Sequence, residues 1–191
     1  MNSLKKIKEW LNTFTSFNEQ EQVDCQYIRQ FLEEEPNLLL RDNVKMHFTA
    51  SAWVLNPSKD KVLMLYHNIY QSWSWSGGHA DGEGDLLSVA MKEVKEESGL
   101  VSLKPLSDSP ISIEILGVQP HYKKQKYVSA HLHLNYTFLL HNTKEEKLKI
   151  CPEENSKVDW LSPDEAVRSS TEAWMKPIYK KLNQKMRKYL G

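Results

Sequence analysis

Three glutamates crowd onto one side of a helical stretch in the middle of this sequence. Glu93, Glu96 and Glu97 occur in "SVAMKEVKEESGL", where i, i+3 and i, i+4 spacings bring their side chains together. Each like-charge pair at these spacings costs about 0.2 to 0.5 kcal/mol in an isolated helix. Because that cost is small, and because Lys92 and Lys95 stand between the acids, the glutamates alone also fit an ordinary solvated helix face.

A glycine turn ahead of this helix favours a metal site. Gly77 and Gly78 have no Cβ, so their backbone can approach a ligand closely and direct a carbonyl or amide group at it. Mg²⁺ takes oxygen ligands, usually keeps several waters and is shared with substrate phosphates. Three carboxylates match this requirement better than a cage of His and Cys would. The glycine turn and the acidic helix together therefore indicate a site for a hard cation.

The same stretch resembles the Nudix box. The family pattern is Gly, five residues, Glu, seven residues, Arg-Glu, an aliphatic, any residue, Glu-Glu, any residue, Gly and an aliphatic. In "GHADGEGDLLSVAMKEVKEESGL" the matching positions are Gly78, Glu93, Val94, Glu96, Glu97, Gly99 and Leu100. Seven of the nine fixed positions match at the correct spacing over 23 residues, which is far more specific than a lone glycine motif.

Two positions depart from the family pattern. Gly84 stands where the pattern has its first Glu, and Lys92 stands where it has Arg. Glu83, one place earlier, is a partial replacement for the missing acid, whereas Lys92 keeps the charge but lacks the planar fork with which Arg holds a carboxylate. The wording "GGHADG", with "HFTASAWVL" upstream and "EENSKVDWL" downstream, resembles a Nudix subgroup in which the first Glu is commonly displaced. Gly84 is therefore interpreted as a subgroup feature.

The resemblance covers about Met46 to Ala166 and implies a fold of the α/β (α+β) class. The expected architecture is the Nudix-type α/β/α sandwich with a central mixed β-sheet. The expected organisation is a helical N-terminal extension over 1–45, a Nudix hydrolase domain over 46–166 and a C-terminal helix over 167–191 that packs on the domain.

The resemblance also implies an enzyme that hydrolyses acid anhydrides. A Nudix pyrophosphohydrolase cleaves the pyrophosphate of a nucleoside diphosphate linked to another moiety X, by attack of water on phosphorus. Its Mg²⁺, with Mn²⁺ as an alternative, would be held by Glu93, Glu96 and Glu97 together with the Gly77 carbonyl. Nucleoside triphosphates, ADP-ribose, nucleotide sugars, dinucleoside polyphosphates and coenzyme A derivatives all stay open as substrates, because loops outside the box choose X.

The general base has more than one candidate. Glu93 ranks first among the catalytic glutamates, and Glu153 or Glu154, loop acids beyond the box, are alternatives. A second function class also stays open: a catalytically silent Nudix fold that binds a nucleotide as a sensor or interaction module. Three intact box glutamates favour the enzyme.

Several residues near the box are candidates for substrate contact: Gly78, His79, Lys92, Trp75, His131 and His133. His131 and His133 lie at i, i+2, on one face of an expected strand, where phosphate or leaving-group contacts are favoured over a metal role because no third ligand is evident. Trp73 and Trp75 come just before the glycine turn at i, i+2, so they are expected on one face of a short strand. One of them could stack on a base, although packing against the core beside the box helix is favoured for both.

The apolar pattern predicts the elements that must position these residues. Helical spacing over 3–16 and 19–35 predicts two N-terminal helices, the second with Val23, Tyr27, Ile28 and Phe31 on its apolar stripe. A hairpin is expected around "NPSKD", the box helix from Leu86 to Ser98 with Asp85 as N-cap and Gly99 after its end, and strands in "ISIEILGVQPHY", "YVSAHLHLNYTFLL" and "KVDWL". Ser162 is expected to cap a helical region over 163–189 that is broken at Pro177.

Composition restricts the partners. The 25 basic and 25 acidic residues leave no net field, so nucleic acid is not indicated as a partner, and no apolar run is long enough for a membrane span. Cys25 and Cys151 stand in no ligand spacing and are expected to be buried, as suits a cytoplasmic protein. In the basic last 19 residues, Ile178, Leu182 and Met186 are expected to pack inward and the cations to be solvated. The N-terminal extension could serve as a homodimer arm or as a lid.

Overall fold

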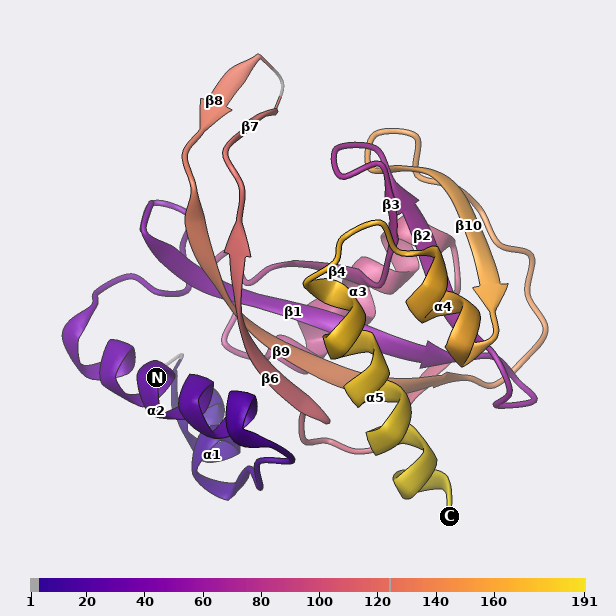
Figure 1. Ribbon diagram of the computed structural model, residues 1–191, viewed down its shortest axis with the longest axis horizontal. Coiled ribbons are helices and arrows are strands. Elements are labelled where there is room, and N and C mark those ends of the chain that lie inside the picture. The colour runs from indigo at the N-terminus through magenta and orange to yellow at the C-terminus, as the bar shows by residue number, and fades with distance from the viewer. Residues whose placement is uncertain (1–3, 124) are drawn as a thin grey trace.

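The computed structural model describes residues 4–123 and 125–191 and shows a mixed sheet between helices (Figure 1). Within the described residues the main sheet has eight strands in the path β10-β2-β1-β9-β5, with β3 on β2, β4 on β1 and β6 on β9. These strands are β1 (Met46–Leu55), β2 (Val62–His67), β3 (Ser72–Ser74), β4 (Ser76–His79), β5 (Leu103–Pro105), β6 (Ser112–Val118), β9 (His131–Asn142) and β10 (Asn155–Leu161). Only β1 and β9 pair in parallel within this part of the chain.

The helices cover both faces of this sheet. They are α1 (Lys5–Thr13), α2 (Glu19–Glu34), α3 (Leu86–Ser98), α4 (Pro163–Ser169) and α5 (Met175–Leu190). In Figure 1, α3 lies behind the sheet and α5 crosses in front of it, while a hairpin of β7 (His121–Lys123) and β8 (Lys126–Val128) projects from one end. The expected α/β/α sandwich with a mixed sheet and N-terminal helices is confirmed. None of the helices described is both long and apolar enough to cross a membrane.

The ends of α3 are set by local signals, and the predicted helix from Leu86 to Ser98 is confirmed. The Asp85 carboxylate accepts a hydrogen bond from the Ser88 amide at 3.4 Å, which satisfies one free N–H of the first turn. Gly99 ends the helix with φ of 75°, a left-handed conformation that glycine adopts without a Cβ clash.

Strand β1 separates a core face from a face that is partly polar. Alternate residues from Phe48 to Val54 point into a core shared with α1, α2 and α3. On the other face, Trp53 stacks on Tyr179 of α5, with ring centroids 5.4 Å apart. The earlier residues of that face, beginning with His47, are polar and face a cleft instead of a helix. The helix α5 therefore covers only one end of the sheet and leaves the other end accessible.

The N-terminal helices join the same core. Ile7 and Trp10 of α1 and Ile28 of α2 are buried there. The predicted apolar stripe of α2 is wrong in part, because Val23 and Tyr27 are exposed. The buried side of α2 carries Glu21, Cys25 and Ile28, so one of its inward positions is an acid that no apolar pattern would predict. Cys25 is buried as expected, whereas Cys151 is only half-buried.

An ion cluster explains the buried acid. The Lys181 Nζ atom of α5 lies 3.1 Å from Glu21 Oε1 and 3.0 Å from Glu114 Oε1, and all three side chains are almost fully buried. Lys185 approaches Glu21 from the same helix at 2.6 Å. Burial alone would raise the pKa of Glu21, but the two ammonium groups lower it below its ordinary value. The expectation that the cations of the C-terminal helix are solvated is therefore wrong for Lys181 and for Lys185.

The C-terminal helical region breaks earlier than expected. Ser162 forms a full capping box with Glu165 at the start of α4, as predicted. The chain leaves the helix at Ser170 and re-enters at Met175, so Pro177 lies in the first turn of α5, where its missing N–H leaves no helix bond unmade. The break at Pro177 was a wrong prediction for this reason. Leu182 and Met186 pack inward as predicted, and Ile178 packs against them partly buried.

We predict that replacing Lys181 by Met destabilises the protein strongly. The substitution leaves Glu114 and part of Glu21 as buried charges without their main cation, which costs about 3 to 5 kcal/mol of unfolding free energy. Chemical denaturation of Lys181→Met and of the exposed neighbour variant Lys180→Met measures this difference. Equal unfolding free energies for the two variants would contradict the role assigned to the cluster.

Candidate active site

A cleft of about 1270 Å³ opens at the uncovered end of the sheet. Most predicted site residues line it: Glu93, Glu96, Glu97, Gly77, Gly78, His79, Trp75, His131 and His133. Glu153 and Glu154, the alternative bases, line it as well. Lys92 lies outside the lining. The chain thus brings together carboxylates, imidazoles and aromatic rings from strands and a helix that are distant in sequence.

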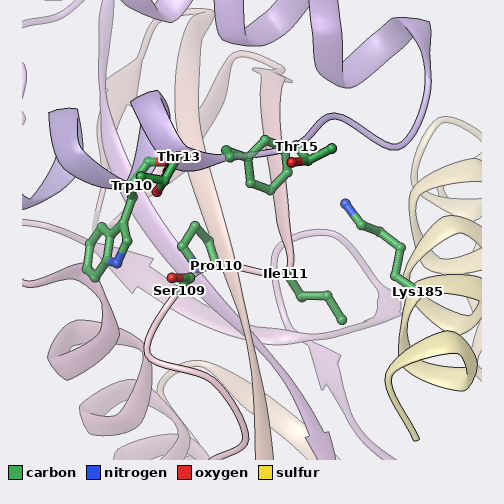
Figure 2. Close-up of a pocket in the computed structure, with 8 residues that line it drawn as sticks. Trp10, Thr13, Thr15, Ser109, Pro110, Ile111 and Lys185 are labelled. Carbon is green, nitrogen blue, oxygen red and sulfur yellow. Dashed lines mark hydrogen bonds between the residues drawn. The ribbon is translucent and has the colours of Figure 1, made fainter. Parts of the chain in front are cut away.

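A smaller cavity of about 310 Å³ lies elsewhere, between α1, the segment before β6 and α5 (Figure 2). Trp10 and Lys185 border it from opposite helices, and the Trp10 indole N–H donates to the Asp108 carbonyl at 2.9 Å. It has one charged side chain and no carboxylate among its lining residues. Most of the predicted site residues therefore line the larger cleft, and none of them lines this cavity.

Glu97 is held by the strand that precedes the box helix. The Ser76 hydroxyl donates to Glu97 Oε2 at 2.5 Å, and the Gly77 amide donates to the same oxygen at 3.3 Å. Burial is the main cause that raises the pKa of Glu97 to about 8; the Ser76 hydrogen bond opposes the shift and the Glu93 carboxylate adds to it. Glu97 is thus a buried acid whose charge lacks a positive partner in these contacts.

Glu93 lies one helical turn earlier and fills the space above Gly78. A Cβ on Gly78 would come within 2.3 Å of Glu93 Cδ, so the carboxylate rests directly against the glycine backbone. Burial raises the pKa of Glu93, Lys92 opposes this and Glu96 adds to it. Glycine is required at position 78 because any side chain would displace this carboxylate.

Glu96 and Lys92 form the exposed edge of the glutamate cluster. Lys92 Nζ lies 3.7 Å from Glu96 Oε2 and 4.0 Å from Glu93 Oε1, and more than half of the Lys92 and Glu96 side chains is accessible to solvent. Lys92 therefore reaches the acids as a point charge from outside the cleft. Its role as a substrate contact stays a prediction.

The other departure from the box lies in the loop before α3. Gly84 is buried, while Glu83 is exposed. The Glu83 carboxylate accepts a hydrogen bond from the Asp85 amide at 2.8 Å, next to the helix cap. Lys6 of α1 pairs with Asp85 at 2.7 Å. The loop is therefore fixed by Glu83 and by an ion pair to the N-terminal helix, which fits the interpretation that Glu83 partly replaces the missing acid.

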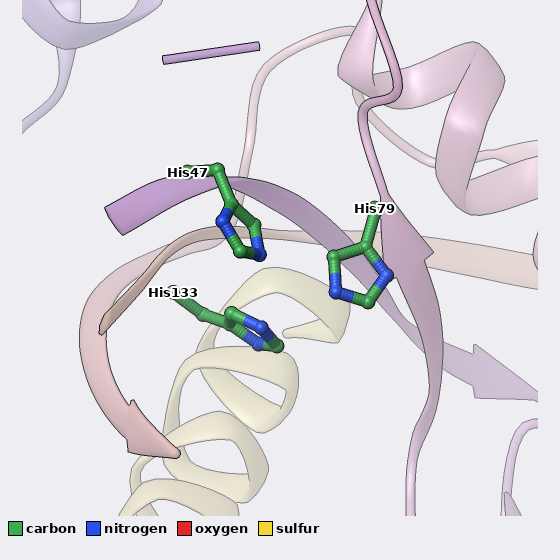
Figure 3. A group of neighbouring side chains, drawn as sticks. All are labelled: His47, His79 and His133. Carbon is green, nitrogen blue, oxygen red and sulfur yellow. The ribbon is translucent and has the colours of Figure 1, made fainter. Parts of the chain in front are cut away.

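Four histidines meet on the polar face of the sheet. The rings of His47, His79 and His133 face one another (Figure 3), and one nitrogen of each lies within 4.8 Å of the others. His131 Nε2 lies 3.1 Å from His133 Nε2. Burial and the neighbouring imidazoles lower the pKa of His133 to about 2. Burial also lowers the pKa of His47, against the effect of its hydrogen bond with the Asn43 carbonyl.

Behind these rings, a hydrogen-bonded polar floor lines the same face. The hydroxyls of Thr49 and Ser51 donate to Asn135 Oδ1 at 3.0 and 2.8 Å. The Asn135 amide donates in turn to Glu114 Oε2 at 3.2 Å. Each buried polar group is thereby satisfied by another, so the floor is both polar and rigid.

Trp75 and Trp73 have different surroundings. Trp75 stands between β3 and β4, lines the cleft and packs edge-on against Tyr179 at 5.4 Å. Trp73 belongs to β3, packs edge-on against Tyr66 at 5.8 Å and is absent from the cleft lining. The two tryptophans therefore do not act as one pair on a single strand, and only Trp75 is placed to meet a ligand in the cleft.

Sequence reasoning did not identify several residues of the cleft. Arg41 binds Asp81 through two hydrogen bonds at its rim. Burial alone would raise the pKa of Asp81, but the Arg41 guanidinium lowers it. Cys151, Glu172 and Tyr70 also line the cleft. A period-two polar pattern, His47-Thr49-Ser51 on β1 matched by the polar positions of β9, was the available signal for the floor.

The glutamates fit a bound divalent cation. Glu93 and Glu97 turn toward one cleft, burial disfavours the charge of both, and Glu96 stands beside them at the exposed edge. A hard cation with oxygen ligands removes the mutual repulsion that the fold otherwise imposes. Mg²⁺ is thus chemically suited to this set of donors.

Comparison with solved structures places the fold. A C. elegans Ap4A hydrolase in a binary complex is 18% identical and has a TM-score of 0.54. The likeness covers 72% of this chain and 95% of the hydrolase chain. The E. coli dihydroneopterin triphosphate pyrophosphohydrolase is 16% identical at TM-score 0.51, covering 70% of this chain and 92% of its own. The Nudix hydrolase RenU of M. smegmatis is 13% identical at TM-score 0.52, covering 72% and 84%. These likenesses concern the fold.

The family is shown by the sequence itself. No curated protein gave a significant match. A family model of the NUDIX domain matches residues 45–182, well over half of the chain, including β1, α3 and the first half of α5. The chain therefore belongs to the Nudix hydrolases, a family of pyrophosphohydrolases that act on acid anhydrides.

Proposed function

We propose that this protein is a Mg²⁺-dependent hydrolase that cleaves the pyrophosphate linkage of a nucleoside diphosphate linked to X. The observation that carries the proposal is the pair Glu93 and Glu97, held against the glycine strand β4 and turned into the large cleft. Burying two neighbouring acids costs free energy. A silent module has no need for such a pair in its cleft.

The residues of the cleft have different proposed roles in the reaction. Glu93, Glu96 and Glu97, with the Gly77 carbonyl, would hold the Mg²⁺, which neutralises phosphate oxygens and activates water when bound. Ser76 and the Gly77 amide fix the Glu97 carboxylate, which limits its reorientation during reaction. His79, next to Gly78 on the same strand, is placed to contact the phosphates, as are His131 and His133 across the cleft.

Glu93 is the proposed general base. It lines the cleft directly beside Gly78, where a water that attacks phosphorus would stand near the metal site. Glu153 and Glu154 line the same cleft and compete with it for this role. Single Gln variants at the three positions, compared by turnover number and by Mg²⁺ requirement, separate the base from residues that only bind the ion.

The volume of the cleft restricts the size of the group X, and a hydrolysis screen must identify it. A cleft of about 1270 Å³ has room for a nucleotide with a second substituent. Two of the similar structures are an Ap4A hydrolase and a dihydroneopterin triphosphate pyrophosphohydrolase, which supports a nucleotide-type phosphoanhydride as the substrate class. A hydrolysis screen of nucleoside triphosphates, ADP-ribose, nucleotide sugars, dinucleoside polyphosphates and coenzyme A derivatives, with Mg²⁺ or Mn²⁺, tests the proposal.

A nucleotide-binding sensor module is the second candidate, and Gly84 and Lys92 are the observations in its favour. Both stand at positions where the box has a different residue, and Lys92 lies outside the cleft lining. Binding of a nucleotide without release of phosphate or nucleoside monophosphate across the whole screen would favour this module. We also propose a cytoplasmic location and a small-molecule partner; the homodimer stays a prediction of the sequence.

Replacing Glu97 by Gln is expected to abolish Mg²⁺-dependent pyrophosphate hydrolysis while the fold is kept. Gln still accepts the hydrogen bond from Ser76, but it contributes no charge to the cation. A loss of at least about 100-fold in kcat/KM, equivalent to about 2.7 kcal/mol, is expected. Glu33→Gln, an exposed glutamate of α2, is the matched control. Near wild-type turnover in the Glu97 variant would contradict the assignment.

A Gly78→Ala substitution is expected to damage activity more than stability. Its Cβ would meet Glu93 Cδ at 2.3 Å, and the end of a flexible side chain can move aside without disturbing the backbone. The displaced carboxylate should raise the Mg²⁺ concentration for half-maximal rate and lower kcat by at least roughly tenfold. Thermal unfolding monitors the fold in parallel. An unchanged Mg²⁺ dependence in a folded variant would refute the contact as functional.

Trp75, and not Trp73, is expected to report nucleotide binding. Trp75 lines the cleft, whereas Trp73 packs outside it. Titration with ADP should quench tryptophan fluorescence in the wild type and in Trp73→Phe, and quench it less in Trp75→Phe. Equal quenching in the two variants would contradict the assignment of Trp75, and not Trp73, as the ring that contacts the nucleotide.

A further inference from the structure

The three histidines His47, His79 and His133 come from three neighbouring strands. His47 of β1 is the direct partner of His133 in the parallel ladder with β9. His79 of β4 is the partner of Thr49, two residues along β1 on the same face as His47. The sheet register alone therefore brings the three rings together, with centroids 4.9 to 5.1 Å apart. We call them the histidine triad.

The ring of His47 is oriented toward the other two. Its Nδ1 atom lies 3.1 Å from the Asn43 carbonyl, which only accepts hydrogen bonds, so Nδ1 carries the proton and Nε2 keeps the lone pair. Nε2 is buried and has no hydrogen-bond partner among the described residues. A buried nitrogen left without a partner destabilises the fold, because it has lost its hydrogen bond to water and gained none in return. A metal ion is a partner that removes this cost.

His131 supports the triad from the side. Its Nδ1 atom lies 2.8 Å from the Ser129 carbonyl, and its Nε2 atom lies 3.1 Å from Nε2 of His133. A hydrogen bond from a ring nitrogen to a backbone carbonyl is one of the usual ways in which metal-binding histidines are held in orientation. Two of the four rings are thus fixed by backbone carbonyls before any ligand arrives.

From this geometry we propose that the histidine triad is a second metal site, distinct from the glutamates and selective for a borderline-soft divalent cation such as Zn²⁺. Imidazole nitrogen suits Zn²⁺ and its neighbours in the first transition row, whereas carboxylates and waters suit Mg²⁺. A set of three histidines leaves a fourth position of a tetrahedral ion open to water or to a phosphate oxygen in the cleft. The one cleft thereby holds two sites of different ion preference.

The triad needs only a small closure to bind the ion. Zn–N bonds of about 2.0 to 2.1 Å place tetrahedral ligand atoms about 3.3 Å apart. The ligand atoms of the triad lie within 4.8 Å of one another, so the largest gap must shorten by roughly 1.5 Å. His79 stands at the end of β4, where the loop to α3 begins, and it is less buried than His47. Rotation of this side chain can supply most of the closure.

Isothermal titration of the full-length, chelator-treated protein with Zn²⁺ tests the site. Excess Mg²⁺ is present throughout to occupy the glutamates. The wild type is expected to bind one Zn²⁺, and His79→Ala is expected to weaken that binding by at least about tenfold. His141→Ala removes a histidine of β9 that lies outside the cleft lining, and it serves as the matched control. Circular dichroism confirms that each variant is folded.

Two further measurements keep the test decisive. Co²⁺ bound by three imidazoles in a four-coordinate site gives intense visible absorption, which a six-coordinate oxygen site lacks. That absorption should appear in the wild type and in Glu97→Gln and be lost in His79→Ala. His133→Asn should behave as His79→Ala does, and if it does not fold, His79→Ala alone decides. Zn²⁺ binding that is absent in the wild type, or equal in the wild type and His79→Ala, overturns the proposal.

Discussion

The close approach of the two glycines of β4 to an acidic helix is the constraint on which the rest of this site depends. β4 passes so near α3 that Gly78 has no room for a Cβ beside Glu93, and the Gly77 amide reaches the Glu97 carboxylate. A Cβ on Gly77 would also collide with the Ala50 carbonyl of β1, at 2.7 Å. The two glycines are therefore fixed from both sides, by the sheet and by the helix. These contacts hold the carboxylates of Glu93 and Glu97 side by side at the same cleft.

The polar face of the sheet gives the cleft its second property. Thr49, Ser51 and Asn135 satisfy one another, and Asn135 passes the network on to Glu114. Glu114 in turn pairs with Lys181 on the buried side of α5. The floor of the cleft is thus connected by buried hydrogen bonds and ion pairs to a helix that covers the far end of the same face. Buried networks of this kind rigidify a site because every member depends on its neighbours.

Local signals in the sequence predicted local structure well. The cap at Asp85, the left-handed Gly99 and the capping box at Ser162 each act within a few residues, so the ends of α3 and the start of α4 could be predicted. Family spacing predicted the three glutamates of α3 from one continuous stretch of sequence. The hydrogen bonds of Glu97 with β4 join residues only 20 and 21 positions apart in the chain.

Contacts between distant segments were the ones that sequence reasoning missed. Lys181 is buried because Glu21 and Glu114, far away in the chain, face it; its position in a basic helix predicted the opposite. The predicted apolar stripe of α2 was wrong in part because Glu21, an acid, occupies a position on the inward side of the helix. The meeting of His47, His79 and His133 depends on strand register, which no pattern within one strand specifies. The sequence alone indicated only that His47 and His133 belong to period-two polar patterns along their strands.

The ion cluster also has a consequence for the order in which the molecule is completed. Glu21 comes long before Lys181 and Lys185 in the chain, so it is synthesised well before its partners. Until α5 leaves the ribosome, Glu21 and Glu114 have no cation of this helix to pair with, and the end of the sheet that α5 covers stays open to water. The nascent chain can thus form the Nudix box and the hairpin before α5 is made, but the ion cluster behind the floor of the cleft is completed only when α5 packs over the sheet.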